Sequence, residues 1–154
     1  MDECMAACCG VAPRRNVSDL FDRGRRRARQ SPLPIQGDEH RDPNGLAARF
    51  SLAVEGDKLS KVGFKATTCI TLIAYCELIA ELTGGESIPQ AARLSVADLI
   101  AQLPDVPALK RDRALLAIAA FRDALAAAWT ELSSNQSNGG SKYESRLHLR
   151  HAAP

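Results

Sequence analysis

Apolar and polar positions alternate over residues 47–54, where Phe50, Leu52 and Val54 are separated by charged or small side chains. A two-residue period of this kind is typical of a strand with one buried face. The Glu-Gly-Asp triplet at residues 55–57 has the composition of a tight turn. The pattern therefore predicts the first strand of a β-hairpin.

The second strand of this hairpin is expected over residues 58–67. Its apolar side chains include Leu59 and Val62, and the spacing between these two shifts the period by one residue. An extra residue in one strand of an antiparallel pair restores the alternation of faces. We therefore expect a bulge near Ser60–Lys61.

A different period follows the hairpin, because apolar side chains recur at helical spacing over residues 69–82. Thr67 or Thr68 is expected to cap this helix, and Gly84 to end it. Further helices are expected at residues 16–29, capped by Asn16 or Ser18, and at residues 87–94, 95–102 and 107–132.

The order helix, hairpin, helices predicts an α+β fold, a small antiparallel sheet with helices packed on one face. Residues 30–45 contain three prolines and two glycines and are expected to form a loop. We expect one domain over residues 16–132, a disordered leader over residues 1–15 and a disordered tail over residues 133–154.

Composition says more about where the protein is located than about what it does. The 154 residues are 45% hydrophobic but only 5% aromatic, and the net charge is +2. No apolar run approaches the roughly 18 residues that a membrane span needs. The five cysteines are odd in number and partly clustered, unlike a secreted disulfide framework. We therefore expect a cytoplasmic protein that does not enter a membrane.

Several segments resemble the NifU/IscU-type iron–sulfur cluster scaffold family. The Phe-Lys-Ala-Thr-Thr-Cys run at residues 64–69 resembles the family's Phe-Lys-x-x-Gly-Cys segment, and Gly84 follows where the family ends its main helix. Residues 19–21 resemble its opening Asp-Leu-Tyr. Residues 95–103 resemble its short acidic helix, and residues 114–117 its last helix. The resemblance implies the SufE/NifU fold.

The resemblance covers roughly residues 18–128, but two of the family's three ligand cysteines are replaced. The family has a Cys-Gly-Asp motif before the hairpin, where this chain has Asn-Gly-Leu at residues 44–46. The third family cysteine falls near Arg113, or Asp112 if the alignment slips by one. Only Cys69 is matched.

Cys69 is therefore the candidate cofactor-binding and metal-binding residue that the resemblance implies. It would hold an iron–sulfur cluster or iron, or accept sulfur from a cysteine desulfurase, with a desulfurase or a complete scaffold protein as partner. An iron–sulfur cluster normally has four ligands, mostly thiolates. One thiolate cannot hold it on a monomer, and a homodimer would pool only two. A thiolate at a helix N-terminus is stabilised by the helix dipole.

Other residues offer competing interpretations. Cys76 lies on the apolar stripe of its helix and is expected in the core. Cys4, Cys8 and Cys9 could bind zinc or iron, or belong to an unstructured terminus. His40, with neighbouring acidic residues, could bind a metal or form a plain polar loop. The five arginines of residues 23–29 could contact nucleic acid, a membrane surface or an acidic partner. No nucleic-acid motif accompanies them, so a solvated or docking face is favoured.

Enzymatic motifs are missing from the sequence. It contains no Ser/His/Asp arrangement, phosphate-binding loop or Cys-x-x-Cys pair. We expect no autonomous enzyme and no catalytic residues. The sequence thus favours a scaffold-like protein of iron–sulfur cluster assembly, and the alternative is a non-catalytic interaction or regulatory module that binds no metal.

Overall fold

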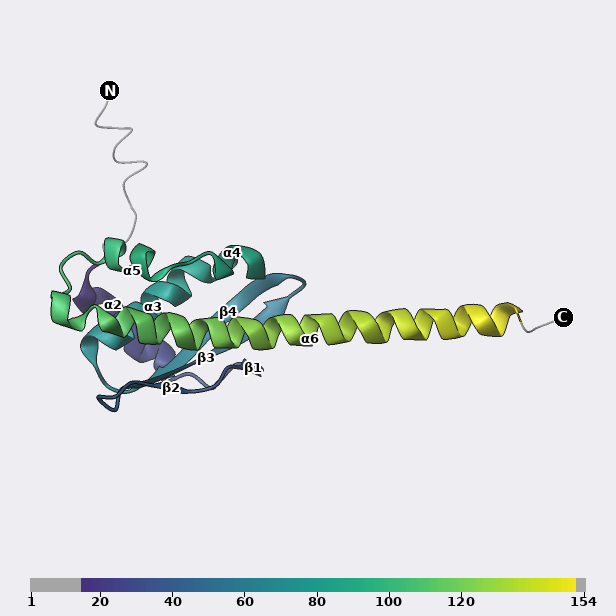
Figure 1. Ribbon diagram of the computed structural model, residues 1–154, viewed down its shortest axis with the longest axis horizontal. Helices are drawn as coiled ribbons and strands as arrows, with labels where there is room; N and C mark the ends of the chain where they lie inside the picture. The colour runs from purple at the N-terminus through teal and green to yellow at the C-terminus, as the bar shows by residue number, and fades with distance from the viewer. Residues whose placement is uncertain (1–14, 152–154) are drawn as a thin grey trace, which may run out of the picture.

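The computed structural model describes the backbone of residues 15–151 and the side chains of residues 15–136. Its elements are α2 (Val17–Ala28), β1 (Ile35–Gln36), β2 (His40–Arg41), β3 (Ala47–Glu55), β4 (Lys58–Ala66), α3 (Ile70–Thr83), α4 (Ile88–Ala92), α5 (Val96–Gln102), a 3-10 turn (Ala108–Lys110) and α6 (Asp112–His151). The expected α+β class is confirmed. The helices gather around a small antiparallel sheet, and α6 runs across the molecule and projects beyond it (Figure 1).

The hairpin forms as the alternation predicted. β3 lies at the centre of the sheet, with β4 on one side and the short β1 and β2 on the other. Phe50 pairs with Phe64, but the register shifts beyond Ala53, which pairs with Lys61 while the next residue pairs with Leu59. The unpaired residue is Ser60, whose hydroxyl donates to the Ala53 carbonyl oxygen at 3.0 Å. The expected bulge is confirmed.

Two short strands interrupt the segment expected as a loop. Ile35 and Gln36 pair with Leu52 and Ser51, and residues 40–41 pair with residues 48–47. Pairings of two residues are too short to show a period, so the sequence does not predict them. They complete the sheet on the β3 edge opposite β4.

The core lies between the sheet and the helices α3 and α6. Phe50 from β3 contacts Phe64 with ring centroids 5.8 Å apart, and Phe121 of α6 edge-on at 5.3 Å. Every residue of α3 from Thr71 to Ala80 is buried. The expected apolar stripe is therefore only part of a helix that is covered on all sides. The helices occupy one face of the sheet, as predicted.

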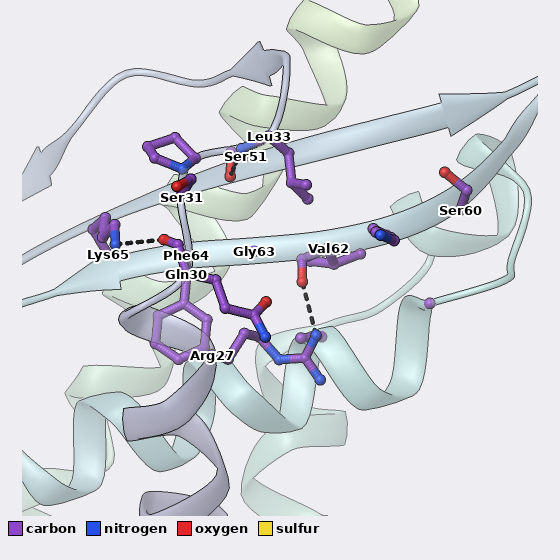
Figure 2. A pocket seen from close by; sticks show the side chains of 14 residues that line it. Arg27, Gln30, Ser31, Leu33, Ser51, Ser60, Val62, Gly63, Phe64 and Lys65 are labelled. Atoms are coloured by element: carbon purple, nitrogen blue, oxygen red, sulfur yellow. Dashed lines mark hydrogen bonds between the residues drawn. The ribbon is translucent and has the colours of Figure 1, made fainter.

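The loop after α2 covers part of the other face of the sheet. The backbone N–H of Leu33 donates to the Ser51 hydroxyl at 3.0 Å. A Cβ at Gly63 would lie 3.1 Å from that hydroxyl and 3.5 Å from Leu33 Cδ1, so the loop sits close over a small residue. Arg27 and Lys65 line the adjacent pocket of about 210 Å³ (Figure 2).

The helix ends differ from expectation at two places. The helix expected from Pro107 begins instead with the 3-10 turn, and α6 starts at Asp112. At the other end α6 continues to His151 rather than ending near Leu132, so residues 133–151 are helical where a disordered tail was expected. No proline interrupts this stretch before Pro154, which explains why the helix can continue. Residues 1–14 of the expected leader lie outside the described residues, and Arg15, its last residue, donates from Nη1 to Gln102 Oε1 at 2.9 Å.

Candidate functional site

Cys69 is the N-cap of α3 and not part of its first turn. Its backbone is extended (φ −135°, ψ 122°), its carbonyl oxygen accepts from the Ile73 N–H at 2.9 Å, and its side chain makes no capping hydrogen bond. The thiol is partly exposed. The sulfur does not serve the cap and lies at the positive end of a 14-residue helix.

The prediction that a threonine caps α3 is wrong, because Cys69 is the N-cap and Thr67 makes other hydrogen bonds. Its hydroxyl accepts from the Ala47 N–H at 2.9 Å, and its own N–H donates to the Ala47 carbonyl oxygen at 2.9 Å. These bonds extend the β3–β4 pairing past Ala66. They fix the junction from which Cys69 enters α3.

Arg113, in the first turn of α6, lies beside this thiol. Its Nη1 donates to Asp112 Oδ1 at 2.6 Å and to the Leu109 carbonyl oxygen at 3.3 Å. The pKa of Arg113 is raised chiefly by the hydrogen bond to Asp112, and further by interaction with the Cys69 side chain. Its Nε is buried and has no hydrogen-bond partner among the described residues. The residue expected at a lost ligand position therefore faces the surviving thiol.

Asn44, at the other lost ligand position, lies in the turn between β2 and β3. The Asp42 carboxylate accepts from the backbone N–H groups of Asn44 and Leu46, both at 2.9 Å. Gly45 adopts a positive φ of 83° there. The turn leads into Ala47, next to Thr67, so it lies at the same end of the sheet as Cys69. Asn44 is exposed and brings no thiolate to that end.

His40 belongs to β2, and its acidic neighbours make polar contacts within this segment and with α6. His40 Nε2 lies 3.6 Å from Asp123 Oδ2, and the same oxygen accepts from the Asp38 N–H at 2.7 Å. Glu39 pairs with Arg41. Within the described residues no three His, Cys, Asp or Glu side chains are grouped to hold a metal ion. The leader cysteines Cys4, Cys8 and Cys9 lie outside the described part of the chain.

Cys76 belongs to the core. Its side chain has no exposed surface, and burial raises the pKa of its thiol, with further contributions from Glu77 and Cys69. A thiol held neutral in this way is a poor nucleophile and a poor metal ligand. Cys69 is therefore the one partly exposed thiol of the described residues.

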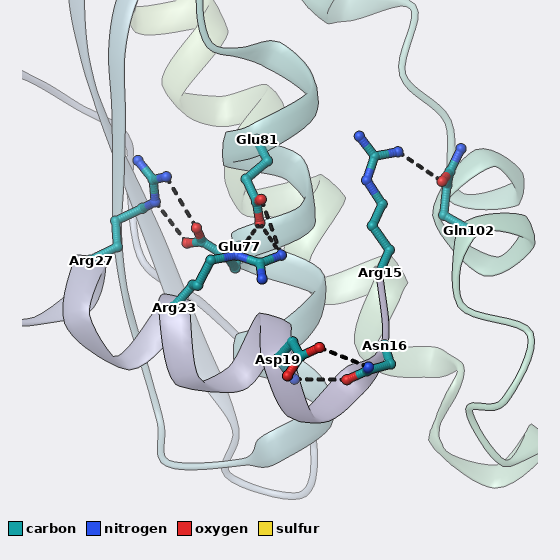
Figure 3. Close-up of polar contacts among 8 residues, drawn as sticks. All are labelled: Arg15, Asn16, Asp19, Arg23, Arg27, Glu77, Glu81 and Gln102. Carbon is teal, nitrogen blue, oxygen red and sulfur yellow. Dashed lines mark hydrogen bonds and ion pairs between the residues drawn. The ribbon is translucent and has the colours of Figure 1, made fainter. Parts of the chain in front are cut away.

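The arginine-rich helix divides into a structural side and a solvated side. Arg23 contacts Glu81 at 3.1 Å and Arg27 contacts Glu77 at 2.7 Å, which joins α2 to α3 (Figure 3). Arg25 lies over the Phe21 ring at 5.6 Å and, like Arg26 and Arg29, is exposed. The charge run thus serves the packing of α2 in part, which the sequence alone could not separate from a docking face.

Comparisons with known proteins agree with this geometry. The model of the NifU-like N-terminal domain family matches residues 14–132. A search of the curated proteins found no match. No helix in the described part of the chain is long and apolar enough to cross a membrane.

Two solved structures are similar to this chain. A proposed iron–sulfur cluster assembly scaffold protein for the SUF system (FiSufU), from the thermophilic Fervidobacterium islandicum AW-1, is 16% identical with a TM-score of 0.53, covering 69% of this chain and 93% of that chain. A hypothetical protein solved at 2.3 Å is 18% identical over 76% of this chain and 96% of its own, and its TM-score of 0.39 adds no argument. The first likeness concerns the fold, while the match over residues 14–132 shows that this chain belongs to the NifU-like N-terminal domain family.

Proposed function

We propose that this chain is a sulfur carrier of iron–sulfur cluster assembly that accepts sulfur on Cys69. The observation that carries the proposal is a partly exposed thiol, free of any capping bond, at the N-terminus of α3 in a NifU-like domain. The N-terminus of a helix carries partial positive charge, which favours the approach of an anionic sulfur donor. The protein acts as a carrier and not as an autonomous enzyme.

The transfer is an exchange between two cysteines. The Cys69 thiolate attacks the terminal sulfur of a persulfide on a donor protein, and a new S–S bond forms to Cys69 Sγ. The donor's own S–S bond breaks, and the donor cysteine leaves as a thiolate. The proton of the persulfide stays on the transferred sulfur or passes to water. The sulfur atom moves from the donor cysteine to Cys69 without net oxidation, so no further reactant is needed.

An iron–sulfur cluster does not fit the described residues as cargo of a single chain. Four ligands are normally required, and these residues offer one reactive thiol, with an arginine at one lost position and an exposed asparagine at the other. We propose a cysteine desulfurase as the sulfur donor and a complete scaffold protein as the receiver. Anaerobic reconstitution with iron and sulfide should leave the chain without a visible absorption band.

Mass spectrometry tests the transfer directly. The protein is incubated with a cysteine desulfurase and cysteine, alkylated and digested. We expect one added sulfur on the peptide that contains Cys69, and none after Cys69→Ser. Cys76→Ala is the matched control, because that thiol is buried and should not compete.

Two outcomes would overturn the proposal. Sulfur on Cys76 or on the leader cysteines but not on Cys69 would place the chemistry elsewhere. No added sulfur in the wild type, with a desulfurase that loads a complete scaffold in the same assay, would leave the non-catalytic interaction module as the better account.

A further inference from the structure

The surroundings of Cys69 are cationic at the place where the family has a ligand thiolate. Arg113 reaches it from the first turn of α6, while Cys69 starts α3, so the beginnings of two helices converge. Only 18% of the Arg113 side chain is exposed, against 49% for Asp112, its ion-pair partner. The Arg113 side chain is therefore mostly covered by the protein, while its ion-pair partner is open to solvent.

The hydrogen bonds of the Arg113 guanidinium involve only part of the group. Nη1 is occupied by Asp112 and by the Leu109 carbonyl oxygen, and these two bonds fix the plane of the group. Nε is buried without a partner among the described residues. A buried donor without an acceptor is unfavourable, so such a group favours any acceptor that arrives.

A persulfide on Cys69 would supply that acceptor. Sulfur transfer lengthens the side chain by one S–S bond of about 2.0 Å, and the terminal sulfur carries negative charge when ionised. A guanidinium binds anions through charge-assisted hydrogen bonds, which are about twice as strong as neutral ones. The same positive charge opposes the approach of a divalent metal ion, because like charges repel strongly in a partly buried site.

We propose that Arg113 is the positioning residue that binds sulfur on Cys69 as a persulfide anion, in the place where the family's third ligand cysteine would bind a metal ion. This rests on the proposed function and deepens it. Residue 113 thereby converts the site from one for metal ions to one for anionic sulfur. The class of cargo is sulfane sulfur, carried without iron or zinc.

The persistence of the persulfide tests this inference. Wild type, Arg113→Ala and Arg113→Lys are loaded by a cysteine desulfurase, separated from it, and sampled over time by alkylation and mass spectrometry. The loss of one charge-assisted bond predicts that the persulfide of Arg113→Ala disappears about tenfold faster. Arg113→Lys keeps the charge without Nε, and should fall between the two. Arg122→Ala is the control, because that arginine lies on α6 and donates instead to the Leu94 carbonyl oxygen at 3.4 Å.

A second measurement does not depend on sulfur loading. Arg113→Cys should bind Co²⁺ with a thiolate-to-cobalt charge-transfer band that the wild type lacks, and adding Cys69→Ser should abolish the band. Equal persulfide lifetimes in wild type and Arg113→Ala would overturn the inference and leave sulfur acceptance on Cys69 intact. A wild type that never acquires sulfur on Cys69 would instead overturn the proposed function. The same cobalt spectrum in wild type and Arg113→Cys would also contradict the role of residue 113.

Discussion

Two arginines lie beside α3, one at its flank and one near its N-terminal end, and their hydrogen bonding differs. Arg27 donates Nε and Nη2 to the two Glu77 oxygens at 2.7 and 3.1 Å, and Nη1 to the Val62 carbonyl oxygen at 2.9 Å. Arg113 interacts with Cys69, the N-cap of α3, but its Nε has no partner among the described residues. All three nitrogens of the Arg27 guanidinium are hydrogen-bonded, whereas Nε of Arg113 is not. A satisfied arginine stabilises the fold, whereas an unsatisfied one next to a thiol marks the site.

Removing Arg27 should have the largest effect on stability. Glu77 is 2% exposed, so Arg27→Ala would leave a buried carboxylate without its counter-ion. We expect a loss of about 3 kcal/mol in the free energy of unfolding. Urea unfolding measures it. Arg23→Ala is the matched control on the same helix, and because its partner Glu81 is more exposed, it should cost about 1 kcal/mol. Equal losses of stability in the two variants would show that the deeper burial of Glu77 does not make its ion pair contribute more than that of Glu81.

The close approach of α2 to α3 depends on Gly24, which lies between these two arginines. A Cβ there would come within 2.6 Å of Ile73 Cγ2 and 3.1 Å of the Ile73 carbonyl oxygen. Overpacking of this kind costs about 1–3 kcal/mol, which exceeds the gain of up to about 1 kcal/mol in helix propensity. We expect Gly24→Ala to lower the thermal midpoint. A raised midpoint would mean that α2 can shift away without loss.

The Glu77 pair should also shape the response to acid. Burial raises the pKa of Glu77, and the ion pair with Arg27 only partly opposes this. Between that raised pKa and the ordinary value of 4.5, the folded state binds more protons at Glu77 than the unfolded state does. Lowering the pH through this window should therefore stabilise the wild type relative to Glu77→Gln. The measurement is urea unfolding of both proteins at several pH values, and a gap that moves the other way would contradict the raised pKa.

Arg113→Ala should have the smallest effect on stability. Its partner Asp112 is half exposed, and surface pairs of this kind contribute about 1 kcal/mol or less. We expect the urea midpoint to stay close to that of the wild type, although the chemistry at Cys69 changes. A loss as large as that of Arg27→Ala would make Arg113 a structural residue and remove the contrast between the two.

The sequence predicted the parts of the fold that repeat along the chain. The alternation around Phe50 and Leu52 indicated β3, and the shifted spacing indicated the bulge at Ser60. The helix expected at residues 95–102 is also present, and a capping box of Ser95 and Asp98 begins it. Each of these signals lies within a few neighbouring residues.

The site was only partly predictable, because its contacts join residues that are far apart in the sequence. Cys69 and the replacement by Arg113 were readable from the resemblance, but their contact joins positions 44 residues apart and depends on how α6 crosses α3. The spare Nε depends on which oxygens Arg113 already uses. The engagement of Asp42 in its own turn is likewise a matter of backbone geometry. Such partnerships leave no pattern in the chain.

The bond from Arg27 to the Val62 carbonyl oxygen has a further consequence. β4 is an outer strand of the sheet, and outer strands offer unpaired backbone groups to other molecules. α2 lies along this strand and occupies one of its acceptors with a charged side chain. Detachment of α2 would therefore expose a template for intermolecular strand pairing. The arginine that joins two helices therefore also covers a backbone acceptor of the outer strand.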